Sequence, residues 1–263
     1  MFYHSDRIIV MLKYVKIFLI FFSLISVTKA QTFGFGCLGF VGGYGGFVYQ
    51  NVEAKGLNQF ITEFNLETYE TFGVLKSIDN ASGFRIGLNF FRATFQNDII
   101  LTAKGFYQYV GKTSSSKIEN TNSYNYSLDL DIQNWAIGFD VGWEFTRLVS
   151  WKIVDGSLNF NYVTLTETTD LPGETTVQKY KSDSGVLGYS IGTGIIISLI
   201  KDYISLEGSA GYTYISITNV YDENGTPLLN PISVNNSEYI NDDFINAGGF
   251  TAVVQLNVGF PLL

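Results

Sequence analysis

The sequence has few charged residues, little proline, one histidine and one cysteine. Only 15% of its 263 residues are charged, whereas a soluble domain usually carries about 25%. Four prolines stand beside 27 glycines, 22 phenylalanines and 17 tyrosines. This mixture favours strands, tight bends and exposed rings over helices. The composition therefore argues against a helical enzyme.

The first 30 residues differ from the rest of the chain. Lys13 and Lys16 precede an apolar stretch at 17–27, and small residues follow as far as Ala30. That order is typical of a secretory signal peptide cleaved after Ala30, with Met11 as an alternative start. The apolar stretch is well short of the ~20 residues that a membrane-spanning helix needs. We expect residues 1–30 to be removed on export and residues 31–263 to form one domain.

The mature chain would contain no histidine, because His4 lies in the leader, and would keep Cys37 as its single cysteine. Neither a Ser-His-Asp nor a Cys-His arrangement can then form, and most zinc and copper sites lose their usual ligands. We therefore expect no enzyme, no metal and no cofactor. The leader carries four of the 16 basic and one of the 24 acidic residues, which leaves a net charge of −11 and argues against a nucleic-acid partner.

Alternation of large apolar residues with small or polar ones recurs along the mature chain. It is clearest at 134–145, where every second residue from Trp135 to Phe145 is large and apolar, and the residues between them are small, polar or charged. This period of two is the pattern of a β-strand with two different faces. Eight such runs predict strands at 33–49, 82–95, 99–112, 126–145, 151–166, 185–200, 203–218 and 248–260.

The predicted connections alternate in length. Short turns fall at 96–98, 146–150 and 201–202, whereas long polar segments fill 50–81, 113–125, 167–184 and 219–247. Within the first long segment, Leu57, Phe60, Ile61 and Phe64 have helical spacing and predict an amphipathic helix at 53–65 that covers the barrel mouth. The alternative is a strand at 62–75, which would raise the strand count to ten.

The location of the large apolar face decides the fold class. If that face pointed inward, the outer coat would be glycine, serine and alanine, which is poor for a soluble protein. If it faces lipid, a closed barrel satisfies every backbone hydrogen bond and its lumen can hold charges. We therefore predict an all-β, antiparallel, up-and-down transmembrane β-barrel, most simply of eight strands.

Two tryptophans are candidates for the membrane interfaces. Trp135 and Trp143 share the apolar face, about 26 Å apart along a strand at ~3.3 Å per residue. A tilt of ~40° shortens this to about 20 Å, near the ~25 Å height of an outer-membrane apolar band. The alternative is that both are ordinary buried side chains.

The leader, the eight alternating runs, the alternating turns and the closing run FTAVVQLNVGF resemble the OmpA/OmpX-like outer-membrane β-barrel family of Gram-negative bacteria. The resemblance implies periplasmic short turns, four long loops outside the cell, and contact with outer-membrane lipids and the outer-membrane assembly machinery. One departure is visible. Barrels of this class often end in an aromatic residue, but here Phe260 is followed by Pro261, Leu262 and Leu263.

The polar face of the runs supplies the candidate site. We predict that a set of charged and amide side chains lines the lumen: Arg85, Asn89, Lys104, Gln108, Asn134, Asp140, Glu144, Glu207, Gln255 and Asn257. An eight-stranded barrel is just wide enough to be filled by side chains. A hydrogen-bonded plug is therefore favoured over a conducting path, because unpaired charges there are costly.

Two functions follow from these expectations. The first is a structural or surface-interaction barrel of the outer membrane with a filled lumen and an extracellular partner that the sequence does not name. The second is a small passive pore or uptake channel for small solutes or lipids, suggested by the stripe of Gly188, Gly192 and Gly194.

Overall fold

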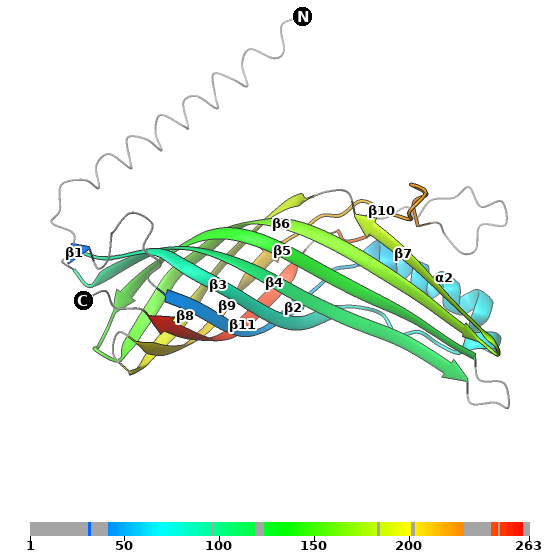
Figure 1. Cartoon of the computed structure of the whole chain (residues 1–263), viewed down its shortest axis with the longest axis horizontal. Coiled ribbons are helices and arrows are strands. Elements are labelled where there is room, and N and C mark those ends of the chain that lie inside the picture. The colour runs from blue at the N-terminus through cyan, green and yellow to red at the C-terminus, as the bar shows by residue number, and fades with distance from the viewer. Residues whose placement is uncertain are drawn as a thin grey trace, which may run out of the picture.

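The polypeptide forms a long, curved β-barrel with a helix at one end (Figure 1). The structure is a computed structural model that describes residues 31–32, 42–95, 97–118, 124–182, 185–200, 203–228, 243–246 and 248–259. The predicted signal peptide, Cys37, residues 33–41 of the first predicted strand, and Phe260 with the residues after it lie outside the described residues.

Eight of the described strands close the barrel. Each pairs antiparallel with its neighbours, and the ring closes where β6 pairs with β8 and β11 pairs with β2. The barrel strands are β2 (Gly42–Asn51), β3 (Asn80–Thr94), β4 (Ile99–Ile118), β5 (Tyr124–Glu144), β6 (Val149–Leu171), β8 (Val186–Ile200), β9 (Ile204–Tyr214) and β11 (Gly249–Gly259). The predicted all-β, antiparallel, up-and-down barrel of eight strands is confirmed.

Four further elements belong to the described chain. They are β1 (Gln31–Thr32), α2 (Lys55–Phe72), β7 (Glu174–Ser182) and β10 (Val220–Tyr221). The predicted helix at 53–65 corresponds to α2, which begins two residues after residue 53 and ends seven residues after residue 65. The alternative of a strand at 62–75, and with it a ten-stranded barrel, is wrong, because residues 62–72 are helical.

Two of the predicted polar loops are instead strand. β4 continues to Ile118 through the predicted loop 113–125, and β6 continues to Leu171, where the turn Pro172-Gly173 leads into β7. Gly173 has φ +91°, which suits the third position of a tight turn after proline. The polar side chains of these segments led to the prediction of loops. The alternation and the threonine content, which are typical of strands, nevertheless continue after the apolar residues stop.

The chemical character of β5 inverts part-way along its length while its pleat continues without a break. The outward residues change from Asp129, Asp131 and Gln133 to Trp135, and apolar residues follow at every second position to Trp143. The inward side chains change in the opposite sense, from apolar Ile132 to polar Asn134. β6 shows the same inversion, with Val163 and Asn161 on its inner side. The lipid-facing zone therefore ends near Gln133, and the strands continue beyond it into water.

Beyond that level the sheet has its apolar face inside and is closed by α2. Figure 1 shows the helix at the same end of the barrel as the curved extensions of β4 to β7, beside β7. We call the resulting cluster the apolar cap. Its main side chains are Leu57, Phe60, Ile61 and Phe64 from α2, together with Val110, Tyr126, Leu128, Leu130, Ile132, Val163 and Leu165 from the sheet. Within the described residues, no helix has both the length and the apolar character needed to cross a membrane.

Two asparagines attach α2 to the segment that returns to β3. The Asn58 amide accepts from the Ile78 backbone N–H at 2.8 Å and donates to the Ile78 carbonyl at 3.2 Å. Asn65 makes the same pair of bonds with Leu75, at 2.8 and 3.0 Å. Both asparagines therefore satisfy backbone groups that would otherwise be unpaired beside the cap.

We expect Asn65→Ala to loosen the cap without opening the barrel. The substitution orphans the N–H and C=O of Leu75, at a cost of about 1–3 kcal/mol. Hydrogen exchange should accelerate in residues 55–79 and stay unchanged in β9 and β11. Asn125→Ala, on the outer face of β5, is the matched control. Equal protection of α2 from hydrogen exchange in Asn65→Ala and Asn125→Ala would contradict the prediction.

Candidate functional site

Most of the predicted lumen residues point into the barrel. Seven are buried: Arg85, Lys104, Gln108, Asn134, Asp140, Glu207 and Gln255. Asn257 is half-buried and donates from Nδ2 to the Glu207 Oε2 atom at 3.3 Å. Asn89 and Glu144 are also half-buried, and the Asn134 Oδ1 atom has no hydrogen-bond partner among the described residues. Glu144 lies at the last residue of β5, beside the short turn.

Five charged side chains form the centre of the interior, and we call them the charge cluster: Lys104, Asp140, Lys152, Asp155 and Glu207. Lys104 Nζ lies 2.5 Å from Asp155 Oδ1 and 3.5 Å from Asp140 Oδ2. Lys152 Nζ lies 3.4 Å from Asp140 Oδ2 and 3.3 Å from Asp155 Oδ2, and it also pairs with Glu207 Oε1. These contacts connect four strands across the lumen.

Sequence reasoning missed Lys152 and Asp155. A register shift between them in the β6–β8 pairing places both on the inner side although they are three residues apart. The signal was present in the sequence, since Ile153 and Val154 are two adjacent apolar residues, and both are exposed on the lipid side. A bulge of this kind breaks strict alternation and re-aims the side chains that follow it.

A layer of amides separates the charge cluster from the apolar cap. Gln108, Asn134 and Asn161 are register partners on β4, β5 and β6. Gln108 Nε2 donates to Gln50 Oε1 at 3.2 Å, and Gln108 Oε1 accepts two bonds from Arg85. The interior is thus charged, then amide-lined, then apolar along the axis.

The outer surface of the barrel carries aromatic side chains at two levels. Trp135 is 61% exposed and its ring centroid lies 5.0 Å from that of Tyr107. Trp143 is 42% exposed, packs 4.7 Å from Phe145, and is the register partner of Trp151. The two predicted interfacial tryptophans therefore both face outward, near opposite ends of the apolar belt.

A four-stranded sheet extends beyond that belt. This projecting sheet comprises residues 112–118 of β4, 124–133 of β5, 163–171 of β6, and β7. Its outer face is polar, with Thr113 Oγ1 donating to Asp129 Oδ1 at 2.5 Å and Thr175 Oγ1 donating to Asp170 Oδ1 at 2.8 Å. β7 pairs with β6 along one edge. Its other edge pairs with the two-residue β10 only at Lys181 and Ser182, so 174–180 have no strand beside them among the described residues.

One carboxyl group lies on the inner side of the projecting sheet. Glu167 of β6 is the register partner of Leu128, and burial raises the pKa of the Glu167 carboxyl. Burial and the nearby Glu167 charge also raise the pKa of the Tyr126 hydroxyl. The Glu167 carboxyl is therefore harder to ionise in the folded protein than in the unfolded chain.

We expect the cap to be more stable in mild acid than at neutral pH. A carboxyl whose pKa is raised in the folded state stabilises fully below its unfolded pKa of about 4.3, and that contribution is lost as the pH rises through the folded pKa. Glu167→Gln should remove this slope and raise the cap's resistance to urea at pH 7. Glu174→Gln, at the exposed start of β7, should keep the wild-type slope. If cap stability depended on pH in the same way in Glu167→Gln and Glu174→Gln, Glu167 would not be the group responsible.

No described group of three or more histidine, cysteine, aspartate or glutamate side chains has an arrangement that could hold a metal ion. Comparison with known proteins found no matching family model and no matching curated protein. Membership of the OmpA/OmpX-like family is therefore not shown.

Solved structures with a similar fold do match. One is the crystal structure of Ail, the attachment invasion locus protein of Yersinia pestis, which is 13% identical with a TM-score of 0.38. The match covers 83% of this chain and 97% of Ail. Another is Neisserial surface protein A (NspA), 14% identical with a TM-score of 0.29, over 83% of this chain and 97% of NspA.

Proposed function

We propose that this protein is an outer-membrane barrel of a Gram-negative bacterium whose lumen is closed and whose projecting sheet binds a partner outside the cell. The observation that carries the proposal is the extension of β4 to β7 beyond the apolar belt. A membrane-crossing strand needs about 9–11 residues, whereas β5 has 21 and β6 has 23. The extra residues of these strands form the projecting sheet.

The interior supports a closed lumen rather than a pore. Charge pairs fill the middle of the barrel, and the apolar cap covers one end. A conducting path would have to separate buried ion pairs, which costs several kcal/mol. We expect no conductance above background when the purified protein is inserted into a planar lipid bilayer. Stable single-channel steps would favour the passive pore instead.

The open edge of β7 supports a specific mode of binding. An exposed strand edge is a liability that proteins usually cover or shorten, yet residues 174–179 of β7 are all exposed. Pairing antiparallel through the tight Pro172-Gly173 turn directs Glu174 toward β6, so alternation leaves the backbone N–H groups of Thr175, Val177 and Lys179 on the open edge. An extended peptide could add to this edge as a further strand.

The proposed partner is an extended segment with acidic side chains. Lys179 and Lys181 line a groove of about 480 Å³ beside the edge, together with Asp222 and Glu223. A carboxylate on the incoming strand would lie opposite Lys179 on the outer face, where cross-strand pairs of opposite charge contribute roughly 0.2–1 kcal/mol each.

The test uses purified protein in detergent and a fluorescent decapeptide of alternating threonine and valine that carries one glutamate. We expect Val177→Pro to abolish peptide binding, because proline removes one edge N–H, while leaving the β6 ladder intact. Val177→Thr keeps that N–H and should bind like the wild type. Equal anisotropy changes for all three proteins would refute strand addition at this edge.

Surface exposure is tested separately on cells. Thr168, on the outer face of the projecting sheet, is changed to cysteine in a Cys37→Ser background. We expect a membrane-impermeant maleimide to label Thr168→Cys on intact cells, and Ser198→Cys, inside the barrel, only after unfolding. Absence of labelling at Thr168→Cys on intact cells would contradict the proposed orientation.

A further inference from the structure

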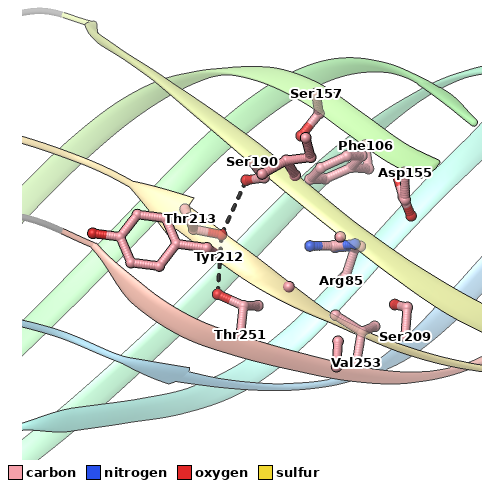
Figure 2. Close-up of a pocket in the computed structure, with 14 residues that line it drawn as sticks. Arg85, Phe106, Asp155, Ser157, Ser190, Ser209, Tyr212, Thr213, Thr251 and Val253 are labelled. Atoms are coloured by element: carbon pink, nitrogen blue, oxygen red, sulfur yellow. Dashed lines mark hydrogen bonds between the residues drawn. The ribbon is translucent and has the colours of Figure 1, made fainter.

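A small cavity lies between the charge cluster and the apolar cap, and its lining includes Ile191 and Tyr212, two side chains that are exposed on the outer surface of the barrel. Its volume is about 40 Å³, and a guest the size of water needs about 10–15 Å³. Its lining also includes Arg85, Phe106, Ser190, Ser209, Thr213 and Thr251 (Figure 2). The space is therefore large enough for a monatomic ion.

Arg85 brings an incompletely paired cation to this cavity. Its side chain is buried, with 8% of the residue exposed. Nε and Nη2 donate to Gln108 Oε1 at 3.0 and 2.7 Å, and Cζ lies 4.2 Å from the centre of the Phe106 ring. Among the described residues, Arg85 makes no ion pair and Nη1 makes no hydrogen bond. Figure 2 shows its nitrogen atoms directed into the cavity.

The hydroxyl groups opposite Arg85 contribute a further free donor. Asn159 Nδ2 donates to Ser190 Oγ at 2.7 Å, Thr251 Oγ1 donates to Thr213 Oγ1 at 2.9 Å, and Ser190 and Thr213 share one hydrogen at 3.0 Å. Whichever of Ser190 and Thr213 donates, the other keeps an O–H with no acceptor among the described residues. The cavity thus presents more donors than acceptors around a positive charge.

One carboxylate also borders the cavity. Both oxygens of Asp155 are engaged, Oδ1 by Lys104 at 2.5 Å and Oδ2 by Lys152 at 3.3 Å. The carboxylate is therefore directed at the lysines of the charge cluster, whose two cations and three anions share the centre of the lumen. Arg85 is left without a carboxylate of its own within ion-pair distance.

We propose that this cavity binds one small monovalent anion of halide size, held by Arg85 Nη1 and the free hydroxyl donors of Ser209 and of the Ser190–Thr213 pair. The buried guanidinium stays charged at every accessible pH, and among the described residues no carboxylate lies within ion-pair distance of it. An anion supplies the missing partner. The inference is independent of the proposed function.

The test measures unfolding of the full chain in lipid vesicles by urea, with chloride or bromide exchanged for gluconate at constant ionic strength. A ligand that binds only the folded state raises the folding equilibrium constant in proportion to its concentration once that exceeds Kd. We expect about a tenfold gain for each tenfold rise in halide, and no gain in gluconate. Arg85→Gln should abolish the response.

Two further variants keep the test decisive if Arg85→Gln does not fold. Ser209→Ala removes one donor and should shift the response to higher halide concentration. Ser198 lies on the same strand as Ser190 but does not line the cavity. The Ser198→Ala variant should therefore respond to halide like the wild type. The proposal is overturned if gluconate stabilises as much as chloride, or if Ser209→Ala and Ser198→Ala respond alike, since the cavity would then hold only water.

Discussion

Replacing Lys152 with methionine should destabilise the barrel by roughly 3–5 kcal/mol, the range measured when one partner of a buried ion pair is removed. Lys152 contacts Asp140, Asp155 and Glu207, and only 3% of its side chain is exposed. Lys104 also contacts Asp140 and Asp155, so Glu207 alone would lose the one cation that pairs with it among the described residues. The loss is large because a carboxylate stays buried without compensation.

The measurement is urea unfolding in lipid vesicles, followed by tryptophan fluorescence and by the mobility of unheated samples on a denaturing gel. Lys179→Met, at the exposed edge of the projecting sheet, should stay within about 0.5 kcal/mol of the wild type. Adding Glu207→Gln to Lys152→Met should restore part of the stability. The amide oxygen still accepts the hydrogen bonds from Gln255 and Asn257, and the unpaired charge is removed. If Lys152→Met is as stable as Lys179→Met, the charge cluster does not hold the barrel together.

Replacing Phe64 with alanine should remove about 3–5 kcal/mol from the apolar cap, as is typical when a buried phenylalanine is truncated. The Phe64 ring lies 4.1 Å from the Tyr126 ring, 6.3 Å from that of Phe60 and 6.1 Å from that of Phe72, measured between centroids. It therefore joins α2 to β5 at the centre of the cap. The barrel wall below the amide layer does not depend on these contacts.

The effect should be local. Limited proteolysis of folded Phe64→Ala should cleave within residues 55–79, while the barrel keeps its fast mobility on an unheated gel. Leu66→Ala on the same helix is the matched control, because Leu66 is 73% exposed. Loss of the barrel's mobility together with the helix would show that cap and barrel fold as one unit, contrary to this expectation.

The barrel itself could be predicted because lipid imposes a strict alternation on every strand that it contacts. In β5 the run from Trp135 to Trp143 shows which side faces outward before any neighbour is known. Arg85, Lys104 and Asp140 could be assigned to the interior on the same ground. Trp135 and Trp143 could be recognised as a pair because residues separated by an even number of positions in a strand share a face.

The projecting sheet was harder to predict because water imposes no apolar pattern on its outer face. Thr164, Thr166 and Thr168 alternate with inward residues in the same way as the lipid-facing run, but their side chains are polar. Polar alternation is weak evidence of a strand when it is read alone. The neighbouring strands β5 and β7, which pair with β6 here, are what make this segment a sheet.

The sequence by itself determined the class of fold and the side of each strand that faces lipid, because hydrophobic periodicity is a local property of the chain. Only the tertiary structure decided which charges meet. Lys104, Lys152, Asp155 and Glu207 come from three strands that are distant in sequence, and a bulge in β6 places Lys152 and Asp155 on the same side although they are three residues apart. Pairing across a closed barrel depends on register, and register arises only when all eight strands are assembled.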